Sequence, residues 1–372
     1  MDEQKIIEVT SPTLPPLDEF MVSLKDIWDK RWITNNGYYH QKLEEALCEY
    51  LHIPYISLFT NGTIALCAAL STLKIKGEVI TTPFSFVATS HVLNYRGIKP
   101  VFVDIEEDTY NIDPNRIEKA ITSQTSAIMP VHVYGTPCDT KKIQEIANKY
   151  HLKVIYDAAH AFNTSINGSS ILTEGDISAL SFHATKVFNT IEGGAIVCKD
   201  LETKKQVDLW KNFGISNETT INSCGINAKM DELRCAYGLI NLKYLADAIS
   251  KRKEVVEFYR LQLSSFPGIT ILKPLPNVEY NYSYFPILID RKIYGITRDE
   301  LYRKLKKSGI NARCYFFPLI SSLPLYKDLD SAKESNLTIA NNISNNILCL
   351  PLHPSLTAAD LNKIISIIKS KL

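Results

Sequence analysis

The chain lacks a strong charge of either sign. Its 372 residues include 41 lysines and arginines and 40 aspartates and glutamates, which gives a formal net charge of +1. This balance creates no large field that would attract nucleic acid or an anionic membrane surface. We therefore expect small molecules or other protein chains as partners, and neither a nucleic acid nor a membrane.

Long apolar runs are missing as well. No stretch approaches the roughly 20 apolar residues that a membrane-spanning helix requires. The opening residues, Met-Asp-Glu-Gln-Lys, do not combine a basic segment with an apolar one as a signal peptide does. We expect a soluble protein of the cytoplasm.

The cysteines show no pattern typical of disulfides or metal sites. Eight are present, far apart, and none forms a CxxC pair or another spacing known for metal ligands. Most lie inside apolar runs. We expect reduced thiols in the core and no metal site.

What the sequence does contain, from about residue 40 to 245, is an alternation of short apolar runs and longer amphipathic stretches. This alternation is typical of βαβ units with a mostly parallel sheet. Because ligands of such sheets bind outside the carboxyl ends of the strands, we expect Asn61-Gly-Thr63, Phe86, Asp157 and Lys186 to share one pocket. The predicted strands cover residues 56–59, 78–81, 99–104, 126–133, 153–156, 177–182 and 195–198.

The pattern changes near residue 246 and predicts two domains preceded by an arm. Residues 37–245 would form a large α/β domain, and residues 246–372 a smaller α+β domain, because their helical and strand-like runs lack the parallel rhythm. Residues 1–36 are polar and proline-bearing at the start. We expect them to form an arm packed on the smaller domain.

The most informative segment is Ser181-Phe-His-Ala-Thr-Lys186, which places a lysine just past a predicted strand. Its neighbours are small, hydroxylated or aromatic, which fits a pocket better than the solvated surface where most lysines lie. Asp157 follows another predicted strand. A lysine that forms a Schiff base and a carboxylate that keeps a pyridine nitrogen protonated are the pair used by pyridoxal phosphate (PLP) enzymes. For Asp157, a helix cap or a structural salt bridge is the alternative.

Three further positions suit the same cofactor. Thr60-Asn-Gly-Thr63 joins a predicted strand to a predicted helix, whose N-terminus would suit a phosphate, although Thr63 could simply cap that helix. Phe86 could stack on a pyridine ring or be a core aromatic. His160 could lie near the phenolic oxygen of PLP or be a structural histidine.

Six segments, in their order and spacing, resemble those of a known protein family. They are Thr60-Asn-Gly-Thr63, Thr82-Pro-Phe-Ser-Phe86, Pro130-Val-His-Val-Tyr-Gly135, Asp157-Ala-Ala-His160, Ser181-Phe-His-Ala-Thr-Lys186 and Gly225-Ile-Asn-Ala-Lys-Met230. Together they resemble the DegT/DnrJ/EryC1/StrS family of nucleotide-sugar aminotransferases, from about residue 32 to 354. The resemblance implies the aspartate-aminotransferase-like fold (fold type I) of PLP-dependent transferases.

The resemblance also assigns roles by position. Lys186 would hold PLP covalently and move protons between the C4′ carbon of the cofactor and the sugar carbon. Asp157 would bind the pyridinium, His160 would lie by O3′, and Phe86 would stack on the ring. The other implied contacts are Gly62, Thr63 and Ser181 at the phosphate, Asn227 and Lys229 from the neighbouring subunit of a homodimer, and Arg313 and Tyr315 at the sugar-nucleotide entrance.

The reaction implied is a ping-pong transamination. L-Glutamate would convert PLP to pyridoxamine phosphate, which would then aminate a keto sugar. The Thr82–Thr89 segment is closer to enzymes that aminate C4 of dTDP-4-keto-6-deoxyglucose, for surface polysaccharide such as O-antigen, than to those acting on 3-keto sugars. Two departures affect the transfer of substrate contacts, because many members have Gly-Pro at Gly37-Tyr38 and Gln or Glu at His160.

Other functions stay open. A 3-keto sugar, or a GDP- or UDP-linked 4-keto sugar, would fit the same family. Sugar dehydration is disfavoured because dehydrating relatives replace the lysine with histidine, and this chain keeps Lys186. A non-catalytic regulatory protein with the same fold is disfavoured because Asp157, Lys186 and Asn227 are all retained.

Overall fold

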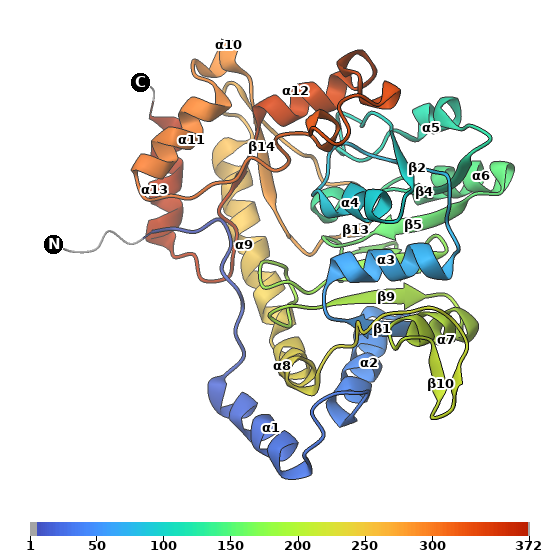
Figure 1. Cartoon of the computed structure of the whole chain (residues 1–372). Helices are drawn as coiled ribbons and strands as arrows, with labels where there is room; N and C mark the ends of the chain where they lie inside the picture. Colours follow the sequence, from blue (N-terminus) through green and yellow to red (C-terminus); the bar gives the residue numbers. More distant parts are fainter. Residues whose placement is uncertain (1–5, 371–372) are drawn as a thin grey trace.

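The computed structural model describes residues 6–370, and its centre is a seven-stranded sheet (Figure 1). The strand order is β1-β9-β8-β5-β4-β2-β3. Strands β3, β2, β4, β5 and β8 are mutually parallel, and β9 is antiparallel to both of its neighbours. The strands are β1 (Tyr55–Phe59), β2 (Glu78–Thr81), β3 (Lys99–Phe102), β4 (Thr125–Met129), β5 (Lys153–Asp157), β8 (Ile177–Ser181) and β9 (Gly194–Cys198).

All seven strands lie where the apolar runs predicted them, and the mostly parallel α/β sheet is confirmed. Alternate residues of the strands enter different apolar clusters. Leu180 packs with the cluster that contains α2 and α8, whereas Ala179 packs with the cluster that contains α3. Because neighbouring strand residues point to opposite faces, the sheet is covered on both sides. The helices of this part are α2 (Tyr38–Leu51), α3 (Gly62–Thr72), α4 (Ala88–Tyr95), α5 (Pro114–Ala120), α6 (Thr140–Tyr150), α7 (Leu201–Trp210) and α8 (Glu232–Lys243).

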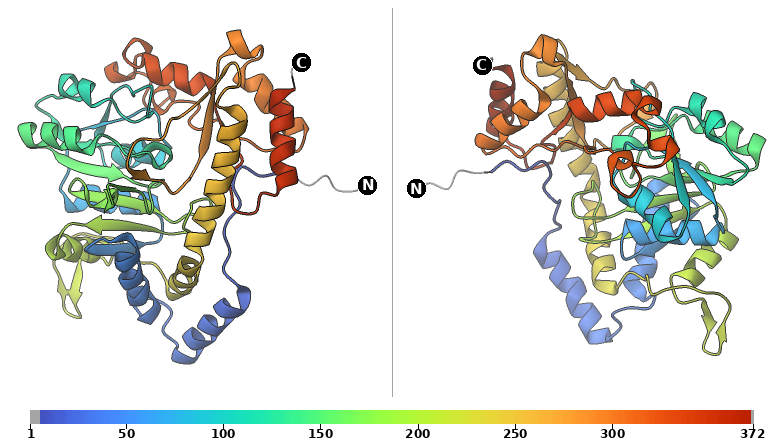
Figure 2. Two further views of the ribbon diagram at one scale, coloured as in Figure 1. Left: turned by 180° about the vertical axis from the view of Figure 1, so that it is seen from behind. Right: turned by 45° about the horizontal axis from the view of Figure 1, so that its top comes forward.

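The C-terminal part has its own antiparallel sheet, in the order β12-β14-β15, with a separate apolar cluster. The long helix α9 runs from α8 to this sheet (Figures 1 and 2). This α+β arrangement follows the change of pattern in the sequence, while the boundary at residue 246 stays a prediction. The elements are α9 (Leu245–Leu263), β12 (Ile269–Ile271), β14 (Phe285–Ile289), α10 (Arg291–Tyr294), α11 (Arg298–Lys307), α12 (Thr338–Asn346), β15 (Ile347–Leu350) and α13 (Ala358–Lys369).

The N-terminal segment contacts both parts. Ile7 pairs with Ile310, and the Val9 carbonyl accepts a hydrogen bond of 2.9 Å from the Leu352 amide. Helix α1 (Leu17–Lys30) instead packs against α8, where the rings of Phe20 and Tyr237 lie 5.7 Å apart. In Figure 1, α1 lies far from the C-terminal sheet. Residues 1–5 of the expected arm lie outside the described residues.

Short strands complete the fold, and the hairpin of β10 and β11 projects beyond α7 in Figure 1. The cysteines are unpaired, and most of them lie in the core as predicted, whereas Cys224 is exposed. Within residues 6–370 no helix combines the length and apolarity needed to cross a membrane. The short strands are β6 (Ser165–Ile166), β7 (Ser169–Ser170), β10 (Ile215–Asn217), β11 (Thr220–Ile221) and β13 (Val278–Glu279).

Candidate active site

A cavity of about 270 Å³ opens at the carboxyl ends of β5 and β8 and at the N-terminus of α3. This is the edge of the sheet at which parallel strands position ligand-binding residues. The expected common pocket therefore exists. Of the site residues predicted from the sequence, it is lined by Gly62, Thr63, Phe86, Asp157, His160, Ser181, Lys186 and Tyr315.

The turn before α3 forms an anion cradle at one side of the cavity. The Asn61 side chain caps the helix by accepting a hydrogen bond of 2.9 Å from the Ile64 amide, so capping does not depend on Thr63. A methyl group on Gly62 would come within 3.0 Å of Cβ of Ser181, which shows how closely this turn approaches the end of β8. Backbone amides and the positive end of the helix dipole suit a phosphate here.

Asp157, at the end of β5, is held by hydrogen bonds rather than by a salt bridge. Its Oδ2 accepts from the Thr89 hydroxyl at 2.7 Å, and its Oδ1 accepts from the Ala159 amide at 3.2 Å. Burial raises the pKa of Asp157, and these two bonds act in the opposite direction by stabilising the ionised form. The carboxylate thus has free acceptor capacity for a cationic ring nitrogen.

Lys186 lies in the loop between β8 and β9, with its backbone amide bonded to the His183 carbonyl at 2.8 Å. Its side chain lines the cavity. Burial lowers the pKa of the Lys186 amine to about 8, although the nearby Asp157 carboxylate acts to raise it. At pH 7 roughly a tenth of the amine is therefore neutral, against less than about one part in a thousand for an ordinary lysine. The amine is thus a usable nucleophile near neutral pH.

His160 is a neutral hydrogen-bond donor at the cavity wall. Burial lowers its pKa well below the usual 6.5. Its Nδ1 lies 3.3 Å from the Tyr134 amide, a group that can only donate, so the ring proton belongs on Nε2. The ring stacks on Phe316, at 5.8 Å between centroids, and meets Tyr284 edge-on at 4.9 Å.

Phe86 is available to a ligand. It is 57% exposed, whereas Phe84, two residues earlier, is fully buried and fills the core position. Of the two readings of Phe86, the structure therefore favours a ring that faces the cavity. Its apolar face could cover a planar ligand.

Sequence reasoning missed several residues of the cavity. Thr89, which does not line the cavity but donates to Asp157, was detectable, because it ends the segment that begins at Thr82. Tyr284 and Phe316 had no local signal, because distant parts of the chain bring them to the cavity. Asn61, which was expected in the pocket, also lines it, and the other cavity-lining residues that were not predicted are Leu66, Ser85, Ala88, Val131, Ala159, Ala179, Leu180, His183, Thr185 and Glu192.

The three remaining predicted residues lie elsewhere. Arg313 lines a neighbouring cavity of about 410 Å³ that shares Tyr315 with the first one. Asn227 and Lys229 line a separate cavity of about 880 Å³ beside α7 and β10. The single chain therefore does not bring Asn227 or Lys229 to its own Lys186.

The residues of the cavity fit PLP. Lys186 offers a partly neutral amine, Asp157 a carboxylate, Phe86 an exposed ring, and the turn at Gly62 an anion cradle that packs closely against Ser181. When bound, PLP supplies an electron sink for charge that develops on the carbon bearing the amino group. Together, the fold and the cavity define a PLP-dependent transferase of fold type I.

Comparison with known proteins identifies the family. The model of the DegT/DnrJ/EryC1/StrS aminotransferase family matches residues 17–369, and the chain belongs to this family. It is 51% identical to the Escherichia coli dTDP-4-amino-4,6-dideoxy-D-glucose transaminase over 369 residues, which is 99% of each chain.

Solved structures of sugar aminotransferases are similar to this chain. DesI, determined with its TDP-sugar product, has a TM-score of 0.93 at 30% identity, covering 98% of this chain and 92% of that one. The sugar aminotransferase Spr1654 of Streptococcus pneumoniae, in its PLP form, has a TM-score of 0.90 at 25% identity, covering 98% of both chains.

Proposed function

We propose that this enzyme converts dTDP-4-keto-6-deoxy-D-glucose into its 4-amino sugar, with L-glutamate as the amino donor. The observation that carries the proposal is the likeness, along nearly the whole chain, to the Escherichia coli dTDP-4-amino-4,6-dideoxy-D-glucose transaminase. The product would serve surface polysaccharide such as O-antigen. The unpaired cysteines favour the cytoplasm as the place of reaction.

Lys186 is the proposed acid and base. A pKa of about 8 lets its amine both accept and release a proton near neutral pH, which is the requirement for moving a proton between two carbons. Asp157 would orient PLP through the pyridine nitrogen and keep that nitrogen protonated. His160 would donate from Nε2 to O3′, and Phe86 would cover the ring and exclude water.

The phosphate of PLP would be held by Gly62, Thr63 and Ser181. Gly62 supports this role because its missing side chain leaves the backbone open beside Ser181. Tyr315, which lines both cavities, and Arg313 in the adjoining cavity would contact the sugar nucleotide.

A homodimer is part of the proposal. Apolar side chains are exposed on α1 and around the β10–β11 hairpin, and several large apolar side chains exposed on one element suit a protein interface. Covered by a second copy of the chain, the hairpin region would bring Asn227 and Lys229 to the phosphate of the neighbouring subunit. The exposed residues are Leu17, Met21, Val22 and Trp28 on α1, with Phe213, Ile215 and Ile221 near the hairpin.

The test is a product assay. Purified enzyme with PLP and L-glutamate is offered dTDP-4-keto-6-deoxyglucose, and separately its GDP- and UDP-linked counterparts and a 3-keto sugar nucleotide. We expect a 4-amino sugar from the dTDP substrate, identified by mass and by the NMR coupling at C4. Turnover only with another nucleotide or with the 3-keto sugar would reject the proposed substrate. Lys186→Ala should abolish turnover.

A further inference from the structure

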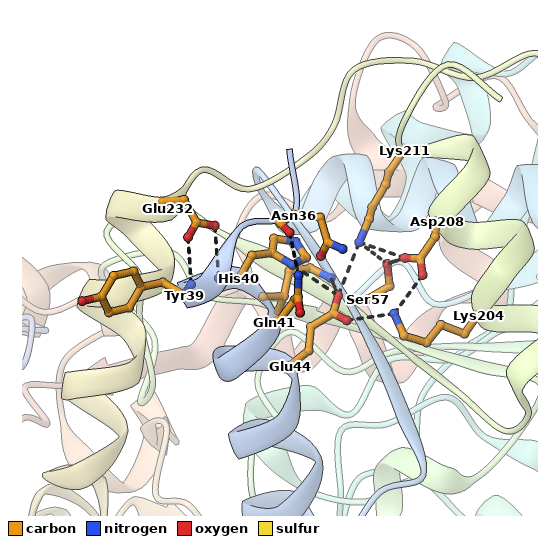
Figure 3. Close-up of polar contacts among 11 residues, drawn as sticks. Asn36, Tyr39, His40, Gln41, Glu44, Ser57, Lys204, Asp208, Lys211 and Glu232 are labelled. Carbon is orange, nitrogen blue, oxygen red and sulfur yellow. Dashed lines mark hydrogen bonds and ion pairs between the residues drawn. The ribbon is translucent and has the colours of Figure 1, made fainter. Parts of the chain in front are cut away.

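A cluster of partly buried charges lies outside the active-site cavity. It consists of Glu44 on α2, Lys204 and Asp208 on α7, and Lys211 just after α7 (Figure 3). Lys204 pairs with Glu44 at 2.9 Å and with Asp208 at 2.8 Å. Lys211 pairs with Asp208 at 2.8 Å and with Glu44 at 3.4 Å.

Lys211 is the most buried member of this charge cluster. Its side chain is only 7% exposed, and its amine also donates to the Ser57 hydroxyl at 2.8 Å. Burial raises the pKa of Asp208, but Lys211 and Lys204 together lower it to about 2, so the carboxylate stays ionised. An ammonium group is costly to bury unless its partners are fixed, so Lys211 has one well-defined position.

Lys211 and its neighbour Asn212 are hydrogen-bonded to the segment that contains Asn227 and Lys229. The Ala228 amide donates to the Lys211 carbonyl at 3.0 Å, and Asn212 pairs with Asn227 as an isolated antiparallel bridge. The Lys229 amine donates to Oδ1 of Asn212 at 2.7 Å. Lys211 and Asn212 therefore fix the segment of Asn227 and Lys229. In the proposed function these two residues contact the active site of the neighbouring subunit.

We propose that Lys211 is a positioning residue for the neighbouring active site, acting through Asn227 and Lys229. The inference rests on the proposed homodimer. The competing route lies within one subunit, because the Thr60 amide donates to the Ala228 carbonyl at 3.0 Å and Ser57 belongs to the strand that leads to Thr60. If the first route holds, replacing Lys211 weakens the active site of the neighbouring subunit. If the second holds, it weakens the active site of the same subunit.

The first experiment compares Lys211→Met with Lys204→Met. Both remove one lysine that pairs with Glu44 and Asp208, but only Lys211 is bonded through its backbone to the Asn227 segment. Each variant is titrated with PLP, and the cofactor fixed by borohydride is counted. We expect Lys211→Met to bind PLP about tenfold more weakly, as for one misplaced hydrogen bond to a charged group, and Lys204→Met to stay within about twofold. Equal losses in both variants would overturn the proposal.

The second experiment uses mixed dimers with two affinity tags. A Lys211→Met subunit is combined with a Lys186→Ala subunit, so that the only remaining Lys186 lies on the subunit that lacks Lys211. Borohydride fixes PLP only at that site, which receives Asn227 and Lys229 from a subunit with an intact Lys211. We expect the PLP affinity of the wild type.

In the reciprocal dimer, both substitutions are on one chain, and its partner is wild type. Here Lys186 belongs to the wild-type subunit, and Asn227 comes from the chain without Lys211, so we expect the weak affinity. The reverse pair of results would place Lys211 in its own subunit's site and overturn the proposal. A chain that binds PLP normally as a monomer would overturn it too, leaving the aminotransferase function intact. A wild-type chain that takes up no PLP would contradict the proposed function itself.

Discussion

Replacing Thr89 with valine tests how the carboxylate of Asp157 is held. The Thr89 hydroxyl lies 2.7 Å from Oδ2 of Asp157 and 2.7 Å from the Ser85 hydroxyl, and all three side chains are buried. An ionised carboxylate can only accept, so Thr89 donates to Asp157, and Ser85 donates to Thr89. Valine keeps the volume of threonine and removes only this relay.

The expected loss follows from the charge on the acceptor. A hydrogen bond to an ionised group contributes about 1.5–3 kcal/mol, more than a bond between neutral groups. Without it the pKa of Asp157, which burial already raises, moves further upward, and a smaller fraction of the carboxylate is ionised to pair with the pyridinium. At about 1.4 kcal/mol for each factor of ten, PLP should bind about ten- to a hundredfold more weakly.

The assay is a titration of cofactor-free enzyme with PLP, followed by the absorbance of the bound cofactor. Thr89→Ser is the matched control, because it keeps the hydroxyl and removes the methyl group, and its affinity should stay near that of the wild type. Thermal unfolding of the cofactor-free proteins separates loss of fold from loss of affinity. If Thr89→Val binds PLP as tightly as Thr89→Ser does, the relay does not support Asp157.

Three other variants test separate features. Burial lowers the pKa of Lys186 from 10.5 to about 8, so the folded protein binds fewer protons than the unfolded chain between these values, and its stability rises with pH there. Below pH 8, burying the protonated Lys186 amine costs the folded state about 3 kcal/mol. In urea unfolding, the free energy of unfolding of Lys186→Met should therefore exceed that of the cofactor-free wild type most at pH 7 and least near pH 10; a pH-independent difference would contradict this. Gly62→Ala, whose new Cβ would lie 3.0 Å from Cβ of Ser181, should move the turn and weaken PLP binding in the same titration, and an unchanged affinity would refute the tight cradle. Glu232 accepts from the amides of Tyr39 and His40 at 2.8 and 3.2 Å through its two carboxylate oxygens (Figure 3). Glu232→Gln places an NH2 donor where one of these acceptors was, so it should lower the unfolding free energy by about 1 kcal/mol; equal urea midpoints would count against it.

Local signals were enough for much of the site. Lys186, Asp157 and Gly62 each follow a predicted strand, and parallel strands that end at one edge bring such residues together whatever their distance in sequence. The sequence offered Thr63 as a helix cap, whereas the structure has Asn61 in that role, because both residue types can cap and the backbone angles decide. The antiparallel direction of β9 could not be predicted either, because an apolar run indicates a strand but not its direction in the sheet.

The sequence by itself determined the order of strands and helices along the chain, the reactive lysine with its carboxylate, and the family, because these depend on residue type and spacing. Only the tertiary structure decided which groups surround them. Tyr284 and Phe316 meet His160 through long-range packing, and burial in the folded chain lowers the pKa of Lys186. Tertiary structure also separated Asn227 and Lys229 from Lys186 and joined them to the charge cluster at Lys211. Such contacts form when segments that are distant in sequence pack together, so they cannot be predicted from any short segment alone.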